Sequence, residues 1–176
     1  LHTISVKKTI NGISPKIVNN KSIDFGLMPD LYGLFPSRYA ANQKLRKLAQ
    51  ENKLCQAILN LETSSHRGCF GLQIDTCLGA CVGKESRVIH DSRLLKSLEK
   101  FRIKVWPFNG PIDLVEELGG WIQRHRILNW CHLETWCSKT KATIEHKSVK
   151  GFDLDSYKIL IKPIMLKNKG IEIVNL

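Results

Sequence analysis

The stretch CFGLQIDTCLGACVGKES, residues 69–86, places three cysteines and three glycines in one short segment. A fourth cysteine lies upstream in the sequence NKLC, so the group consists of Cys55, Cys69, Cys77 and Cys81. Residues 55–84 show little hydrophobic periodicity, so no amphipathic helix or strand explains how they become ordered. Core packing, disulfides and a metal centre are the three explanations to compare.

Disulfides fit poorly, because no secretory signal is present and a chain with 27 lysines and arginines against 16 aspartates and glutamates is expected to bind nucleic acid in a reducing compartment. Free cysteines pack as small hydrophobic side chains, which suits Cys131 and Cys137 beside their tryptophan neighbours. The glycines that flank the first four cysteines favour a thiolate metal site. Cys77 and Cys81, at i and i+4, are expected to point the same way on one helical turn.

The identity of the metal stays open at this point. Zinc sites usually use two short C-x₂₋₄-C pairs, and only one short pair, Cys77 and Cys81, is present. An iron–sulfur cluster tolerates longer and uneven spacing because the cube is wider than a single ion.

The charge of the chain points to a polyanionic partner. The 27 lysines and arginines outnumber the 16 aspartates and glutamates, which gives a net charge of +11 at pH 7. Such an excess favours nucleic acid through phosphate neutralisation and counterion release. A membrane surface fits less well, because no helix combines a basic face with a Trp/Leu face. No window approaches 18 consecutive apolar residues, so we expect a soluble, cytoplasmic protein.

The first half of the chain is predicted to combine strands and helices. Alternation in TISV and KIV around Asn11-Gly12 predicts two or three antiparallel strands that end near Phe25, followed by a connector over 26–37. A helix is predicted over about 38–53, capped by Ser37, with an apolar stripe formed by Ala41, Leu45, Leu48 and Ala49. A second helix is predicted over about 85–100, with these residues inward: Ile89, Leu94, Leu95, Leu98 and Phe101.

The last third is predicted to be a mixed lobe. We expect a turn at Asn109-Gly110, one strand over 121–133, a helix capped by Asp153 or Asp155, and a closing strand in GIEIVNL. The predicted fold class is α+β, with three parts: strands and connector (1–34), the cysteine region with its flanking helices (35–103) and a C-terminal α+β lobe (104–176). Because the chain begins with Leu1 and shows no signal peptide, we expect a piece of a longer protein.

The segment LYGLFPSRYAANQKLRKLAQENKLC, together with residues 69–86, resembles the region that follows the GIY-YIG nuclease domain in the UvrC family of nucleotide-excision-repair endonucleases. The similarity continues through GKES, VWPFNGPIDLVEE, GFDLDSYKIL and KP, where it is closer to short UvrC homologues than to full-length UvrC. It covers nearly the whole chain. The residues at matching positions are Gly33, Phe35, Arg38, Cys55, Cys69, Phe70, Cys77, Gly79, Cys81 and Gly83.

The resemblance implies an upstream GIY-YIG domain that incises DNA on the 3′ side of a lesion. It also implies that the four cysteines carry a [4Fe-4S] cluster linked to DNA binding, with zinc as the alternative metal. Tyr32 and Tyr39 stand outside any GIY-YIG pattern, so no catalytic residue is predicted in this chain. The chain is also too short for both the helical partner-binding motif and the RNase H-like nuclease of full-length UvrC. It departs from its relatives at Asp75-Thr76, where a basic residue often stands.

The predicted function is therefore to bind damaged duplex DNA and to position the GIY-YIG domain of the parent chain. The alternative is a protein-interaction module that docks the nuclease to other excision-repair proteins, with a structural zinc site or no metal. Lys53, Arg67 and Lys84 lie near cysteines and could serve either the cluster or phosphate groups. The candidate DNA contacts are Arg38, Lys44, Arg46, Lys47, Lys53, Arg67 and Lys84. The four tryptophans are expected in the core.

Overall fold

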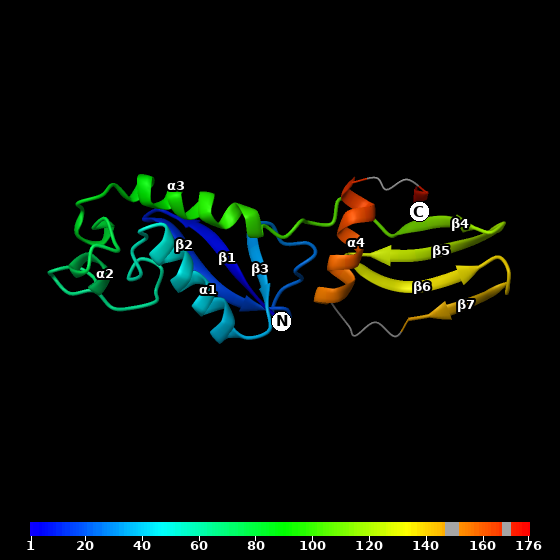
Figure 1. Cartoon of the computed structure of the whole chain (residues 1–176), viewed down its shortest axis with the longest axis horizontal. Coiled ribbons are helices and arrows are strands. Elements are labelled where there is room, and N and C mark those ends of the chain that lie inside the picture. Colours follow the sequence, from blue (N-terminus) through cyan, green and yellow to red (C-terminus); the bar gives the residue numbers. More distant parts are fainter. Residues whose placement is uncertain (147–151, 167–169) are drawn as a thin grey trace. The chain divides into compact units, whose positions relative to one another are not determined.

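The computed structural model describes residues 1–146, 152–166 and 170–176, which form two compact units (Figure 1). Unit 1 comprises residues 1–23 and 29–103, and unit 2 comprises residues 24–28 and 104–176. Each unit contains an antiparallel sheet and at least one helix. The predicted α+β class is confirmed.

The sheet of unit 1 has three strands in the order β2-β1-β3. Strands β1 (His2–Thr9) and β2 (Gly12–Asn19) form the predicted hairpin, which closes at the Thr9–Gly12 pair. Strand β3 (Leu31–Phe35) lies inside the segment predicted as a connector, so that prediction was wrong. Leu31 and Tyr32 are almost completely buried, and this burial outweighs the turn-forming glycine and prolines around them.

Two helices complete the core of unit 1. Helix α1 (Arg38–Glu51) confirms the first predicted helix, and the Ser37 hydroxyl accepts the Ala40 N–H at its N-terminus. Helix α3 (Arg87–Leu98), extended by the short turn η2 (Glu99–Phe101), confirms the second. Leu94 is buried, but Ile89 is 59% exposed. The inward prediction for Ile89 was wrong, because the residues of α3 that are buried at this turn are the polar His90 and Asp91.

Between these helices the chain has little regular structure. Only α2 (Phe70–Gln73) and the 3-10 turn η1 (Ala80–Val82) interrupt the coil. This segment lies at the left of Figure 1, around the label α2. Its buried Leu54 and Leu59 join the main core of unit 1, whereas Cys55, Cys69 and Cys77 form a separate hydrophobic cluster with partly buried apolar neighbours.

Unit 2 contains a five-stranded antiparallel sheet in the order β7-β6-β5-β4-β8, with helix α4 (Leu154–Leu166). The strands are β4 (Ile112–Leu118), β5 (Trp121–Leu128), β6 (Cys131–Cys137), β7 (Ala142–Glu145) and β8 (Ile171–Asn175). The single strand predicted over 121–133 is in fact two strands. Asn129 and Trp130 both have positive φ, as the tight turn between such strands requires. Strand β7 was not predicted, whereas the closing strand β8 was.

The cap of α4 and part of the core of unit 2 agree with the sequence analysis. Asp153 accepts the N–H groups of Asp155 and Ser156, which identifies it as the capping residue. Trp106 and Trp130 are buried and meet edge to face, with ring centres 5.3 Å apart.

The core prediction was wrong for the other tryptophans and for the two downstream cysteines. Trp121 and Trp136 are half-buried, and each has a cationic side chain over its ring: Lys139 and Arg124, respectively. Cys131 and Cys137 are also only half-buried. Among the described residues no helix is long and apolar enough to cross a membrane.

Candidate metal centre

Four cysteines that span 27 residues of sequence converge in unit 1. The Sγ atoms of Cys55, Cys69, Cys77 and Cys81 all lie within 4.8 Å of one another. The first three side chains are buried, and Cys81 is partly exposed. Four sulfur donors at this separation could hold a metal ion, so the structure brings together every cysteine that the sequence singled out.

Short backbone turns rather than a helix aim the sulfur atoms. Cys77 and Cys81 do not share an α-helical turn as predicted, because Gly79 and Gly83 on either side of η1 are both left-handed. This conformation is one that glycine adopts without strain. The Gly79 N–H donates a hydrogen bond to Cys77 Sγ over 3.3 Å. An N–H donor to sulfur stabilises a thiolate ligand.

Helix α3 supports Cys55 through a buried pair that the sequence analysis did not identify. The Cys55 N–H donates to His90 Nε2 over 3.1 Å, and His90 Nδ1 lies 2.9 Å from Asp91 Oδ1. Since Nε2 is the acceptor, His90 is neutral with its proton on Nδ1, and the Nδ1–H donates a hydrogen bond to Asp91. The signal in the sequence that could have identified this pair is the His90-Asp91 dipeptide, which lies near Leu94 on the inner face of the helix.

Asp91 also connects this pair to the sheet. Its carboxylate accepts the Ile13 N–H over 2.7 Å and the Arg87 Nε–H over 2.9 Å. Arg87 in turn donates to the Ile13 carbonyl oxygen over 2.6 Å. A Cβ at Gly12 would overlap the Asp91 carboxylate, so glycine is required for this close approach. The position of Cys55 is thus coupled to strand β2 through one buried carboxylate.

The protonation of the thiols reflects their burial. Burial raises the pKa of Cys55 and of Cys69 to about 11, and it also raises the pKa of Cys77. Burial alone would raise the pKa of Cys81 as well, but hydrogen bonds from the Cys69 backbone and from the Cys55 and Cys69 thiols lower it overall. Cys81 is therefore the thiol of these four that ionises most readily. Metal binding must displace protons from Cys55 and Cys69, whose pKa values are about 11.

The donor set fits both a single ion and a cluster in chemistry, but the spacing favours a single ion. Thiolates around one tetrahedral zinc ion, at about 2.3 Å from the metal, lie about 3.8 Å from each other. Cys55 Sγ and Cys69 Sγ are 3.8 Å apart. In a four-iron cube each thiolate binds a different iron atom, so the sulfur atoms must stand further apart.

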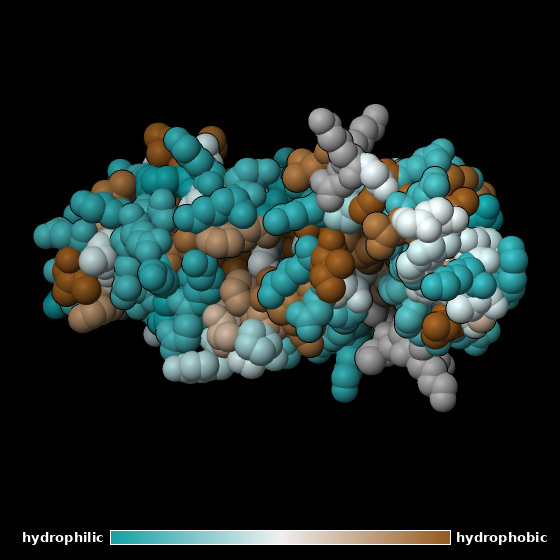
Figure 2. Space-filling view, turned by 45° about the vertical axis from the view of Figure 1, so that its right-hand side comes forward, coloured by the Kyte–Doolittle hydropathy of each residue, from teal (hydrophilic) through white to brown (hydrophobic). Residues whose placement is uncertain are grey.

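The cysteine loop, residues 55–84, carries large apolar side chains that are well exposed: Phe70 (61%), Ile74 (51%), Leu78 (43%) and Val82 (37%). Figure 2 shows this end of unit 1, at the left, as brown patches among hydrophilic surface.

The predicted DNA contacts fall into two groups. Arg46 donates to Gln56 Oε1 and to the Leu61 carbonyl oxygen, so it fastens α1 to the following loop. Lys44 Nζ lies 4.4 Å from the centre of the Phe101 ring, and Lys47 is 3.9 Å from Glu51. The side chains of the other candidates are exposed, with no hydrogen-bond or ion-pair partner among the described residues: Arg38, Lys53, Arg67 and Lys84.

A different cation lies close to the cysteines. Arg93 donates to the backbone carbonyl oxygens of Asn52 and Lys53, pairs with Glu85, and has its pKa raised, with Cys77 among the causes after Glu85. These contacts hold the chain just before Cys55. The sequence analysis missed Arg93 because it lies 12 residues beyond Cys81, the last of the four clustered cysteines.

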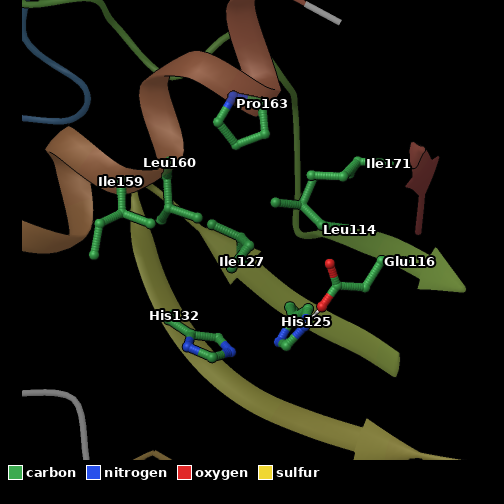
Figure 3. A pocket seen from close by; sticks show the side chains of 9 residues that line it. All are labelled: Leu114, Glu116, His125, Ile127, His132, Ile159, Leu160, Pro163 and Ile171. Carbon is green, nitrogen blue, oxygen red and sulfur yellow. Dashed lines mark hydrogen bonds and ion pairs between the residues drawn. The ribbon is translucent and has the colours of Figure 1, made fainter. Parts of the chain in front are cut away.

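Unit 2 contains a separate pocket of about 260 Å³ between α4 and the sheet (Figure 3). Its walls are mainly aliphatic, and Glu116, His125 and His132 supply its polar groups. His125 Nε2 lies 3.1 Å from Glu116 Oε1. The Thr135 hydroxyl lies within 3.1 Å of ring nitrogens of three histidines: His125, His132 and His146.

This histidine group predicts that the stability of unit 2 depends on pH. Burial, followed by the neighbouring His146 and His125, lowers the pKa of His132. Folded protein then binds a proton less readily than unfolded chain, so stability is lost as the pH falls below the ordinary histidine value of about 6.5. We expect the thermal midpoint to fall by a few degrees between about pH 7.5 and pH 5.5. His132→Gln should reduce this dependence; an unchanged dependence would contradict it.

Comparisons with known proteins give two family matches that together cover most of the chain. Residues 2–100 match the UvrC/Cho excinuclease middle domain, and residues 111–176 match the Excinuclease Cho C-terminal domain. The chain is 43% identical over 156 residues to Excinuclease cho of Escherichia coli K12 and to that of Shigella flexneri, which covers 88% of this chain and 53% of each relative. Identity to the Salmonella typhi protein is 43% over 151 residues, or 85% of this chain and 52% of the relative. The chain thus spans about half the length of these relatives. No solved structure matches.

Proposed function

Because this chain belongs to the UvrC/Cho excinuclease family, we propose that it is the DNA-binding, metal-bearing region that positions a GIY-YIG nuclease on damaged DNA. The nuclease domain would be supplied by another part of the parent protein, which incises 3′ to the lesion. In this role the chain contributes binding and orientation rather than a reacting group. The convergence of the four cysteine sulfurs, in a loop with little structure of its own, carries the proposal.

The distribution of charge supports DNA contact by unit 1. Unit 1 contains sixteen lysines and arginines and seven acidic residues, whereas unit 2 contains eleven and nine. The metal site therefore belongs to the unit that has most of the positive charge. A polyanion is therefore attracted mainly to unit 1. The strength of this electrostatic binding increases with the number of phosphates that the cationic side chains neutralise.

We propose a [4Fe-4S] cluster as the metal group, with Cys55, Cys69, Cys77 and Cys81 as its ligands. A bound cluster would cross-link loop segments and so couple metal binding to folding. A single structural zinc ion is the second candidate, because the sulfur spacing matches one tetrahedral ion. In either case His90, Asp91 and Arg93 orient the Cys55 segment, and the Gly79 N–H stabilises the Cys77 thiolate.

Two measurements on the whole chain, purified without oxygen, test these proposals. Metal analysis with an absorption spectrum should give about four iron atoms and broad visible absorption for the cluster, or one zinc ion and no visible band for the second candidate. Fluorescence anisotropy with a labelled duplex should show affinity that falls steeply as salt rises. Absence of DNA binding at low salt would contradict the DNA role and favour docking to other repair proteins.

A further inference from the structure

A polar groove lies in unit 1 between strand β2 and helix α1. Its volume is about 520 Å³, and its polar lining residues are Ser14, Lys16, Arg38, Asn42 and Asn60. Leu45 and Leu59 contribute to the apolar part. No aspartate or glutamate lines the groove, so its charge comes from two cations alone.

These two cations are not used within the described structure. Lys16 and Arg38 are exposed, and neither side chain has a hydrogen-bond or ion-pair partner among the described residues. Most arginines of unit 1 differ in this respect, because their guanidinium groups are held by acceptors or carboxylates: Arg46, Arg87, Arg93 and Arg102. Lys16 and Arg38 therefore remain available to an external anion.

The arrangement of donors suits phosphate oxygens. Arg38 and Asn42 are one helical turn apart on α1, so their side chains lie on the same face. Lys16 comes from the opposite wall, on β2, and Asn60 from the loop after α1. Guanidinium and ammonium groups neutralise phosphate, while amide and hydroxyl groups donate hydrogen bonds to it.

An extended peptide is the competing occupant, because β2 is an edge strand of its sheet. Ile13 directs its N–H and C=O away from β1, toward Asp91 and Arg87. Alternate residues of a strand share one edge, so Pro15 presents the same outer edge, and proline has no N–H to donate. Strand addition is therefore interrupted in the middle of the groove, and proline on an edge strand is a known protection against such pairing.

We propose that this groove binds the phosphodiester backbone of DNA through Lys16 and Arg38, with Asn42 and Asn60 as uncharged donors. The inference rests on the proposed DNA-binding function and assigns a binding surface separate from the cysteine loop. Contacts to phosphate carry no sequence information, so the groove holds any DNA sequence equally and fixes only the register of the duplex.

Salt titration of DNA affinity on the whole chain tests the assignment. Lys16→Gln and Arg38→Gln should each reduce the slope of log affinity against log salt by about 0.9, and the double variant by about twice that. With one contact fewer, the loss of DNA affinity between about 50 and 200 mM salt should be roughly three-fold smaller than the loss for the parent chain. Asn42→Ala should lower affinity without changing the slope. Lys96→Gln, an exposed lysine on α3 outside the groove, is the matched control.

The outcomes separate this inference from the proposed function. If the parent chain binds DNA and the double variant keeps the parental slope, the groove assignment is wrong while the DNA role stands. If the parent chain does not bind DNA at low salt, the proposed function fails first. If the double variant instead loses an acidic peptide that the parent binds, the groove is a peptide site. Circular dichroism and metal content that match the parent protein should accompany each variant.

Discussion

Replacing Cys55 with alanine is expected to abolish metal binding and to unfold the cysteine loop of unit 1. Alanine cannot ligate a metal, and the loop around Cys69, Cys77 and Cys81 contains only two short helical turns. The free energy of metal binding is then lost as folding free energy, and we expect unit 1 to be destabilised by at least about 3 kcal/mol. Metal analysis and chemical denaturation measure the two effects.

Cys137→Ala is the matched control for this variant. Cys137 lies on β6 in unit 2, is half-buried, and belongs to no group of metal-ligating residues among those described. Its replacement should leave the metal content unchanged and cost little stability. Treating the parent protein with a strong chelator should reproduce the effect of Cys55→Ala. If Cys55→Ala keeps its metal and is as stable as Cys137→Ala, the four-cysteine site is wrong.

Replacing Asp91 with alanine is expected to cost several kcal/mol, at about 1–3 kcal/mol for each buried donor that loses its acceptor, because the Ile13 N–H and His90 would be left unpaired. Asp91 is 6% exposed, and its carboxylate accepts hydrogen bonds from Ile13, Arg87 and His90. His90 would lose the acceptor that fixes its proton on Nδ1. Since His90 Nε2 accepts the Cys55 N–H, the metal should also be released faster to a chelator.

Ser92→Ala, at an exposed position on the same helix, is the control for Asp91→Ala. Asp91→Asn keeps an acceptor but loses the charge, so its effect should be intermediate. His90, the Ile13 N–H and Arg87 lower the pKa of Asp91 against the raising effect of burial, so its stabilising contribution is present above about pH 4. That contribution is lost as the pH falls through the folded-state pKa, and Asp91→Asn should reduce this acid sensitivity. Equal stability of Asp91→Ala and Ser92→Ala would contradict the network.

Local sequence patterns predicted the regular elements well where packing follows a single periodicity. Helices α1 and α3 and the β1–β2 hairpin have a clear apolar stripe or turn signal. Strand β3 was missed because its glycine and the prolines around it favour turns, while its strand character depends on pairing with β1. The turn at Asn129-Trp130 was missed because weak alternation runs across residues 121–133 and tryptophan is common in strands. Ile89 was wrongly predicted to be buried because a distant contact decides this turn of α3. The buried residue there is Asp91, which accepts the Ile13 N–H of β2.

The sequence by itself determined which features are candidates for the chemistry of this protein: four clustered cysteines, a large positive charge and the family pattern that joins them. These features can be identified without the tertiary structure, because they depend only on residue type and spacing. The tertiary structure alone decided which groups support them. His90 reaches Cys55 across 35 residues, and Lys16 and Arg38 line one groove from a strand and from a helix. Such meetings arise from long-range burial and hydrogen bonding, which leave no periodic signal in the chain.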